Sequence, residues 1–285
     1  MPATGRPASK RRTVPDLIAI DDPADPRIAA YRDVRERDLV GRDGLFVAEG
    51  KVVVEKVIAS DRHRLLSLLI AGKRADTLAP MLARLPRDMP VYVADQPVLD
   101  AIAGFPIHRG IIGIGARTET PSADALLARL PGKAAVLLLS GIANHDNMGG
   151  IFRNAAAFGI DAILLDADCC DPLYRKAIRV SVGAALLLPW AMLGRGADPL
   201  VLLDRHRFES VALSPAGTSL LADWRPAPRT AVLLGAEGPG LDAGLLARTT
   251  SLRIEMAGGF DSLNVATTSG IALHHLAAAR TTGHR

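Results

Sequence analysis

Short apolar runs alternate with segments of helical spacing throughout the second half of the chain, and this alternation restricts the possible folds more than any other feature. The expected strands span 134–140, 161–166, 209–214, 230–236 and 251–256, and the expected helices span 150–158, 174–182, 198–206 and the residues from Leu263 onward. Strands that are apolar at nearly every position are typical of a parallel sheet with helices on both faces. We therefore expect an α/β domain built on a parallel sheet.

Three of these strands are followed by segments rich in glycine that also carry polar side chains. Asn147 and Arg153 come after the first strand, Glu237 after the fourth, and Ser262 and Asn264 after the fifth. The carboxyl ends of parallel strands meet at one edge of a sheet, and ligands bind beyond that edge. Glycines let a backbone approach a ligand closely and donate N–H groups to it. The pattern predicts one binding site built from three loops.

The glycine pattern argues against the common nucleotide-binding motifs. The sequence GAEGPG at 235–240 differs from the dinucleotide fingerprint G-x-G-x-x-G, and it follows the fourth strand of the domain, whereas the fingerprint follows the first. The chain also lacks the Gly-Lys-Ser/Thr element of nucleotide triphosphatases. Taken alone, GAEGPG favours a tight turn over a cofactor loop.

The first half also alternates strands and helices, but with a weaker pattern. The expected strands span 44–50, 65–72, 91–95 and 110–116, and the expected helices span 28–40, 51–60 and 96–104. A polar segment with a proline, 117–125, is the expected linker. We therefore divide the chain into a tail at 1–14, a smaller α/β domain at 15–118 and the parallel-sheet domain at 119–285.

The charge distribution singles out the tail. The formal net charge is +4, and the segment 1–12 holds four basic residues and no acid, so the rest of the chain is neutral overall. Such a tail is typically disordered, and it could also add a salt-sensitive grip on nucleic acid. The two cysteines, Cys169 and Cys170, are adjacent and predict neither a disulfide framework nor a metal site. Without a signal peptide or a spanning apolar run, we expect a cytoplasmic protein with no membrane association.

The three glycine-rich segments resemble the three motifs of the SpoU (TrmH-type) family of RNA 2′-O-ribose methyltransferases, in the SPOUT class. The residues that match are Asn147, Gly149, Arg153, Ala155, Phe158 and Gly159; then Leu234, Gly235, Glu237, Gly238, Gly240 and Leu241; then Ile254, Met256, Gly258, Ser262, Leu263, Asn264, Val265 and Ala266. One departure is that Asn144 and His145 stand where many members have Asp-Pro. In the first half, YRDVRER, FVAEGKVVVE and HRGIIGIG resemble the family's substrate-binding domain, which is related to ribosomal RNA-binding proteins.

This resemblance implies a deep trefoil knot in the second domain, a homodimer, and methyl transfer from S-adenosylmethionine to a ribose 2′-hydroxyl of rRNA or tRNA. The implied cofactor-binding residues are Leu234, Gly235, Glu237, Gly238, Gly240, Ile254, Met256, Leu263 and Asn264. The implied catalytic residues are Arg153, Asn147, Glu237, Ser262 and Asn264. The apolar helix from Leu263 to Ala279 is the expected dimer contact, because such a helix is buried on more than one face.

Arg153 lies among apolar residues in IFRNAAAFG, where an unpaired charge would be costly, so we expect it to act on the substrate. Because arginine rarely deprotonates, a clamp on the ribose phosphate and the developing alkoxide is preferred to a general base. Each polar residue also has a structural interpretation: a surface arginine for Arg153, helix caps for Asn147 and Ser262, and a turn acid for Glu237.

Two other functions are considered. A catalytically silent RNA-binding protein on the same fold would be expected to lack Asn147, Arg153 or the third motif, and all are present. A protein that binds NAD would need a glycine-rich turn after the first strand of the domain, where ANHDNMGG does not fit. The sequence therefore favours the methyltransferase.

Overall fold

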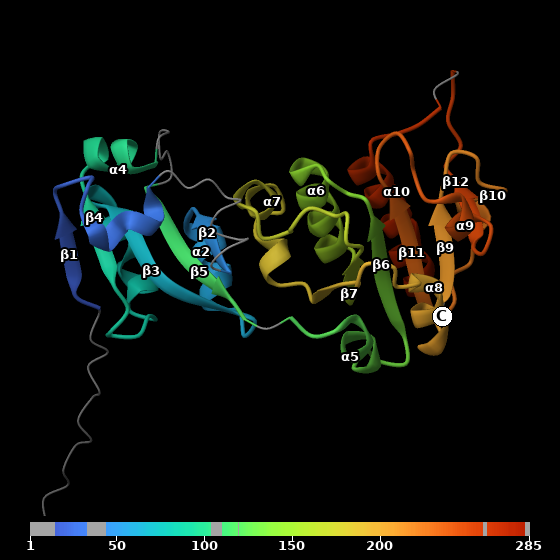
Figure 1. Cartoon of the computed structure of the whole chain (residues 1–285), viewed down its shortest axis with the longest axis horizontal. Helices are drawn as coiled ribbons and strands as arrows, with labels where there is room; N and C mark the ends of the chain where they lie inside the picture. The colour runs from blue at the N-terminus through green and yellow to red at the C-terminus, as the bar shows by residue number, and fades with distance from the viewer. Residues whose placement is uncertain (1–14, 33–43, 104–109, 119, 259–260, 283–285) are drawn as a thin grey trace, which may run out of the picture.

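The computed structural model describes residues 15–32, 44–103, 110–118, 120–258 and 261–282, and it contains two β-sheets that lie side by side along the long axis of the molecule (Figure 1). The basic tail at 1–14 and most of the helix expected at 28–40 lie outside the described residues. Among the described residues, no helix is both long and apolar enough to cross a membrane.

The first sheet has five strands in the order β1-β4-β3-β5-β2 and mixes parallel and antiparallel pairs. Its strands are β1 (Leu17–Ile20), β2 (Leu45–Glu49), β3 (His63–Ala71), β4 (Val91–Ala94) and β5 (Ile111–Arg117). Helices α2 (Lys51–Ile58) and α3 (Ala75–Leu82) cover one face, and α4 (Gln96–Ala103) and the 3-10 helix η1 (Pro26–Tyr31) cover the other. The predicted strands and helices of this half are confirmed from 44 onward, whereas β1 and α3 were not predicted.

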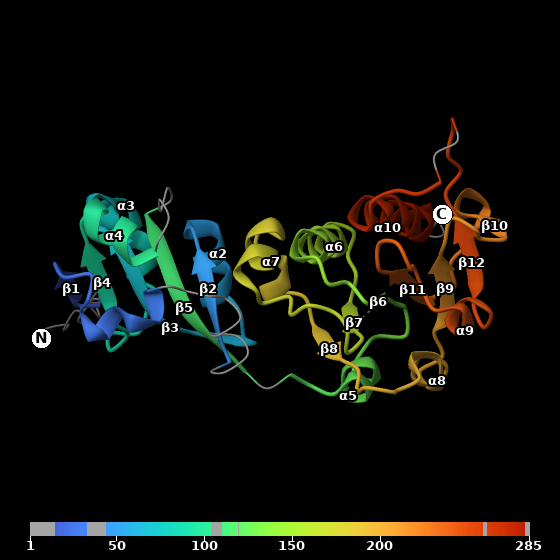
Figure 2. The ribbon, with the colours of Figure 1, turned by 45° about the horizontal axis from the view of Figure 1, so that its top comes forward.

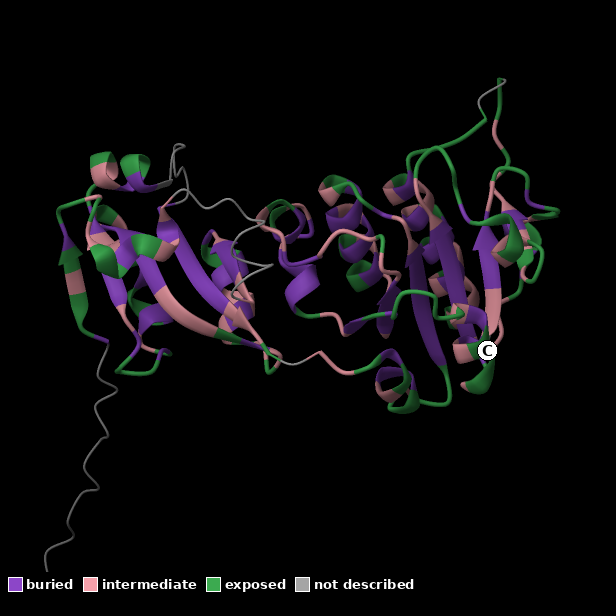
Figure 3. Ribbon diagram, viewed as in Figure 1, coloured by how far each residue is buried: buried purple, intermediate pink, exposed green. Residues whose placement is uncertain are grey.

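The second sheet has seven strands in the order β10-β12-β9-β11-β6-β7-β8, and every pairing in it is parallel, which confirms the predicted sheet type. Its strands are β6 (Ala134–Ser140), β7 (Ala162–Leu165), β8 (Trp190–Met192), β9 (Glu209–Leu213), β10 (Ser219–Leu220), β11 (Arg229–Gly235) and β12 (Thr250–Arg253). The central strands β6, β7 and β11 are buried on both faces, as their continuous apolar runs require, whereas β10 and β12 near one edge are largely exposed or half-buried (Figure 3).

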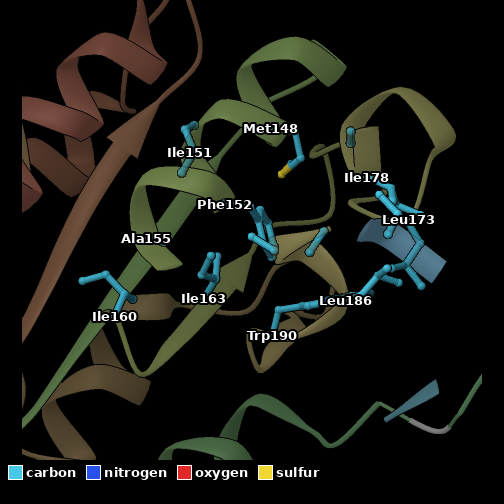
Figure 4. Close-up of a cluster of buried hydrophobic side chains, with 14 of the residues drawn as sticks. Met148, Ile151, Phe152, Ala155, Ile160, Ile163, Leu173, Ile178, Leu186 and Trp190 are labelled. Carbon is cyan, nitrogen blue, oxygen red and sulfur yellow. The ribbon is translucent and has the colours of Figure 1, made fainter. Parts of the chain in front are cut away.

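Helices α6 (His145–Ala157), α7 (Arg175–Val180) and α10 (Val265–Thr282) cover one face of this sheet, and α5 (Ala123–Ala128) and α8 (Pro199–Arg205) cover the other, with α9 (Ala243–Leu246) at its edge (Figure 2). Figure 4 shows the apolar side of α6, including Met148 and Phe152, packed against α7 and Trp190. The contact with α7 is close because Gly149 has no side chain: a Cβ there would lie 2.7 Å from Val180 Cβ.

Three predicted boundaries are wrong, and hydrogen bonds explain two of them. Helix α6 begins at His145 and not at 150, because Asn144 Oδ1 accepts hydrogen bonds from the backbone of Asp146 and Asn147. Helix α10 begins at Val265 and not at Leu263, because Asn264 is its cap. The strand expected at 251–256 ends at Arg253, so the last predicted loop is longer than expected.

The two sheets meet at α7, β8 and α2 (Figure 2), and one apolar cluster runs through both. Arg175 pairs with Glu49 at 2.7 Å, and Lys56 Nζ donates to the Val182 carbonyl at 2.5 Å. The expected linker is held in place, because Arg117 at its start pairs with Asp171.

Candidate functional site

A cavity of about 740 Å³ opens at the carboxyl edge of β9, β11 and β12. All nine residues predicted to bind the cofactor line it: Leu234, Gly235, Glu237, Gly238, Gly240, Ile254, Met256, Leu263 and Asn264. Its volume lies within the range of ordinary ligand pockets, roughly 300–1,000 Å³. The structure therefore brings the second and third glycine-rich segments together around one space.

The loop after β11 needs glycines for two different reasons. It folds back on itself, so that Ala236 bridges to Gly240, and a Cβ on Gly235 would lie 2.3 Å from the Gly240 carbonyl carbon. Gly238, at the tip, has φ +86°, which side chains rarely allow, and a Cβ on it would meet no atom within 4 Å. The segment forms the tight turn that the sequence favours, and this turn lines the cavity, with Gly238 among the lining residues.

Asn264 connects all three segments. Its Nδ2 donates to Asn147 Oδ1 at 2.9 Å and to Glu237 Oε1 at 2.7 Å, while its Oδ1 caps α10 by accepting from Ala266 N and Thr267 N. All four hydrogen-bonding positions of the amide are therefore used, which fixes its orientation. Asn147 is buried in the first turn of α6, and Glu237 is exposed at the cavity rim.

Ser262 also lines the cavity, but it does not cap the last helix. It is exposed, and its hydroxyl lies 3.3 Å from the carboxylate of Asp261, which lines the same cavity. Asn264 takes the cap position because it directly precedes the first helical residue. Ser262 and Asp261 therefore remain available to a ligand.

Arg153 lies apart from these residues, and the expectation that it is surrounded by apolar side chains is wrong. It is exposed on α6 and does not line the cavity. Arg153 lies six positions after Asn147 on the helix. This spacing places the two side chains about 9 Å apart along the helix axis and roughly 120° apart around it. The apolar residues beside it in the sequence point to the opposite side of the helix, where Phe152 and Ala155 are buried.

Several lining residues were missed by sequence reasoning. They are Leu213 at the end of β9, Ser214 and Pro215 after it, and Leu252 and Thr268; Ala236, Asp261 and Val265 also line the cavity but belong to the predicted motif segments. The strand that ends at Leu213 was predicted, but its position between β11 and β12 was not, so the loop after it had no reason to be included.

The loop that leads from β6 into α6 is held by Asp166. This carboxylate accepts from Ser140 Oγ at 2.6 Å and from the Gly141 backbone at 3.0 Å. Burial alone would raise the pKa of Asp166, but these hydrogen bonds lower it below its ordinary value. The described residues hold no group of three or more His, Cys, Asp or Glu side chains that could bind a metal ion.

Comparisons with known proteins identify the family of the chain and solved structures with a similar fold. Residues 134–274 match the model of the SpoU rRNA methylase family. The chain is 37% identical over 268 residues to an uncharacterized tRNA/rRNA methyltransferase of Mycobacterium tuberculosis, covering 91% of each chain. It is 29% identical over 228 residues to the 23S rRNA (guanosine-2′-O-)-methyltransferase RlmB of Photobacterium profundum, covering 77% of this chain and 92% of that one. The fold resembles the AdoMet-bound rRNA methyltransferase of Sinorhizobium meliloti, with a TM-score of 0.76, 23% identity, and coverage of 93% and 98%.

Proposed function

The chain belongs to the SpoU rRNA methylase family, and we propose that it transfers a methyl group from S-adenosylmethionine to a ribose 2′-hydroxyl of rRNA or tRNA. The observation that carries the proposal is the double hydrogen bond of Asn264, which joins Asn147 and Glu237 at the rim of the cavity. The name of the RlmB relative supports the 2′-hydroxyl as the target.

The chemistry of the cavity fits this cofactor. Leu234, Leu252 and Ile254 offer apolar surface on which an adenine ring can lie. The ribose hydroxyls and the charged amino-acid part of the cofactor can bind to Glu237, Asn264 and the open backbone at Gly238. When bound, the cofactor supplies an activated methyl group.

The polypeptide then has to help the ribose hydroxyl lose its proton, since a neutral hydroxyl is a poor nucleophile. A guanidinium donates hydrogen bonds and accepts none, so Arg153 is not suited to take up this proton. We assign it to the stabilisation of the negative charge that develops on the 2′-oxygen and the adjacent phosphate, while a phosphate oxygen or a water accepts the proton. Asn147, Glu237 and Ser262 orient the ribose at the cavity rim.

This assignment requires a second copy of the chain, because Arg153 lies outside the cavity of its own copy. We propose a homodimer in which the faces of α6 and α10 meet, so that Arg153 of one copy reaches the cavity of the other. Exposed apolar side chains support this contact: Leu263 is 40% exposed beside the cavity, and Ile271 is 39% exposed on α10.

Mixed dimers test this arrangement. Arg153→Ala and Gly238→Val are each expected to be inactive. If the sites are shared, co-refolding equal amounts should restore about a quarter of the wild-type sites, because each mixed dimer holds one intact site. No recovery from verified mixed dimers, or a sedimentation mass of one chain, would contradict the shared site.

Finer features of the family belong to the same proposal: a deep trefoil knot at the second sheet, substrate RNA binding by residues 15–118, and a cytoplasmic location. The return of the chain from β12, near one edge of the sheet, to α10, which packs on α6 and β11, supports the knot. Cross-linking of bound RNA followed by peptide mass spectrometry would test the RNA-binding role.

The reaction itself is tested by incubating the protein with labelled S-adenosylmethionine and separate pools of rRNA and tRNA. Nuclease digestion and mass spectrometry should identify one 2′-O-methylated nucleoside that is missing in a strain without the gene. Label on a base, or none in either RNA while the cofactor binds, would refute methyl transfer to ribose. The second outcome would favour the silent RNA-binding protein.

A further inference from the structure

The turn after α7 meets the first sheet in a strained backbone conformation. Val182 has φ +53°, a left-handed conformation that branched side chains rarely adopt, and Gly183 follows with φ +77°. The Val182 carbonyl accepts the hydrogen bond from Lys56 Nζ. A Cβ on Gly183 would lie 2.9 Å from Lys56 Cδ, so the stem of the lysine lies directly on the turn. Lys56, which comes from α2 of the first sheet, is thus held at a fixed place beside the second sheet.

Arg153 comes from the neighbouring helix α6, four residues after Gly149, which lies against Val180 just before the turn that Lys56 contacts. Burial, and then the charge of Arg153, lower the pKa of Lys56. Helix α6, which carries Arg153, contacts the 3-10 helix η3 (Ala184–Leu186) that follows the turn. In the described part of the chain, neither Lys56 nor Arg153 forms an ion pair with a carboxylate. On α7, by contrast, Arg175 pairs with Glu49 and Lys176 pairs with Asp146.

Lys56, which its hydrogen bond holds in place, and Arg153, which α6 carries, are two cations without a carboxylate partner in the described residues, and such a pair favours an anion beside it. Lysine has three N–H donors, and the Val182 carbonyl uses one, so two remain for phosphate oxygens. Arg153 is exposed and presents a planar fork that suits phosphate.

We propose that Lys56 and Arg153 jointly bind one backbone phosphate of the substrate RNA, at the junction of the two sheets. The inference rests on the proposed function only in taking RNA as the ligand. The first sheet thereby contributes a substrate contact next to the residue assigned to the methyl transfer.

The test measures the affinity of the full chain for a fluorescein-labelled RNA hairpin over a series of salt concentrations. Lys56→Met keeps the apolar stem and removes one of the two charges on the phosphate, so Kd should rise and the slope of log Kd against log salt should fall by less than 1, because the full value of about 1 for one phosphate contact requires the loss of both cations. Lys56→Arg should retain the slope. Lys51→Met, an exposed lysine of the same helix that pairs with Glu55 at 3.8 Å, is the matched control and should change nothing.

The double variant Lys56→Met/Arg153→Met tests whether both cations bind the same phosphate. If they do, the double variant loses less affinity than the sum of the two single losses, because the contacts are coupled. Additive losses, an unchanged slope in Lys56→Met, or an equal change in Lys51→Met would overturn the proposal. If Lys56→Met lowers the melting temperature, Lys56→Gln, which can still donate to Val182, replaces it.

The same measurements separate this inference from the proposed function. A changed slope in a protein that methylates no RNA would refute the function and leave the phosphate site standing. Normal methylation by the wild type with an unchanged slope in Lys56→Met would refute the phosphate site and leave the proposed function standing.

Discussion

Asn264 performs two tasks that substitution can separate, because its Oδ1 caps α10 and its Nδ2 bridges Asn147 and Glu237. Asn264→Ala removes both. Loss of the cap should cost about 1 kcal/mol. The buried Asn147 oxygen also loses its partner, which should cost roughly 1–3 kcal/mol. Glu237 is exposed and can form hydrogen bonds with water in the variant, so its lost contact adds little to the loss of stability.

Asn264→Asp should keep the cap, since aspartate caps helices as well as asparagine does. It also places a carboxylate where Nδ2 donated, against the oxygens of Asn147 and Glu237. We therefore expect Asn264→Ala to lower the free energy of unfolding by about 2–4 kcal/mol. For Asn264→Asp we expect a smaller loss of stability, but an equal or larger loss of cofactor affinity.

Urea unfolding gives the stabilities, and calorimetry with S-adenosylmethionine gives the affinities. Asn264→Ser is the matched control, because a serine can cap but is too short to bridge. It should resemble Asn264→Asp in stability and keep more of the affinity. Wild-type cofactor binding and turnover in Asn264→Asp would refute the role of the bridge.

Three further predictions concern other parts of the chain. Arg153→Ala should lower the single-turnover rate at saturating RNA by on the order of a hundredfold while cofactor binding stays unchanged, and Arg153→Lys should recover little of it; near-normal turnover would make Arg153 structural. Gly238→Val should abolish cofactor binding by calorimetry without loss of folded structure, because a β-branched side chain disfavours φ +86° and would force the backbone of this cavity-lining loop to change; retained binding would remove this loop from the site. His63 is buried and near Arg62 and Arg117, so burial first and then these charges lower its pKa to about 4, and the folded state disfavours its charged form. Stability should therefore fall as pH drops from about 6.5 to about 4, by on the order of 3 kcal/mol, and His63→Leu should flatten that part of the stability curve; an unchanged curve would contradict the shift.

The sequence predicted the parallel sheet and the cavity because both depend on local patterns. Continuous apolar runs such as 134–140 predict a strand wherever it lies in the sheet. The glycines at 235, 238 and 240 predict a tight loop, with a close backbone approach at Gly235 and positive φ at Gly238 and Gly240. What it could not predict depends on strand order and helix phase. The loop at 213–215 enters the site because β9 lies between β11 and β12, which no local pattern reveals.

The position of Arg153 also could not be predicted, because it depends on the orientation of α6 about its axis. Its neighbours in the sequence are apolar, but the helix turns them toward the core and turns Arg153 toward solvent. The phase of α6 is set by its first turn, which in turn depends on Asn144 as the cap. Placing the helix start five residues late left Asn147 in a loop and concealed the separation between Asn147 and Arg153.

Helix α6 therefore runs from the cavity rim toward the proposed phosphate site. Its close contacts fix it on two sides, since a Cβ on Gly149 would meet Val180 of α7 and a Cβ on Gly150 would lie 2.8 Å from Ala266 of α10. A helix held this tightly moves as a rigid body. Its first turn holds Asn264 at the cavity rim through Asn147, and Arg153 lies less than two turns further along the same helix. A shift of the first sheet at Lys56 would thus reach α6 through Val182 and η3, so we expect Gly149→Ala and Gly150→Ala to disturb the position of Asn147 as well as the packing of α6.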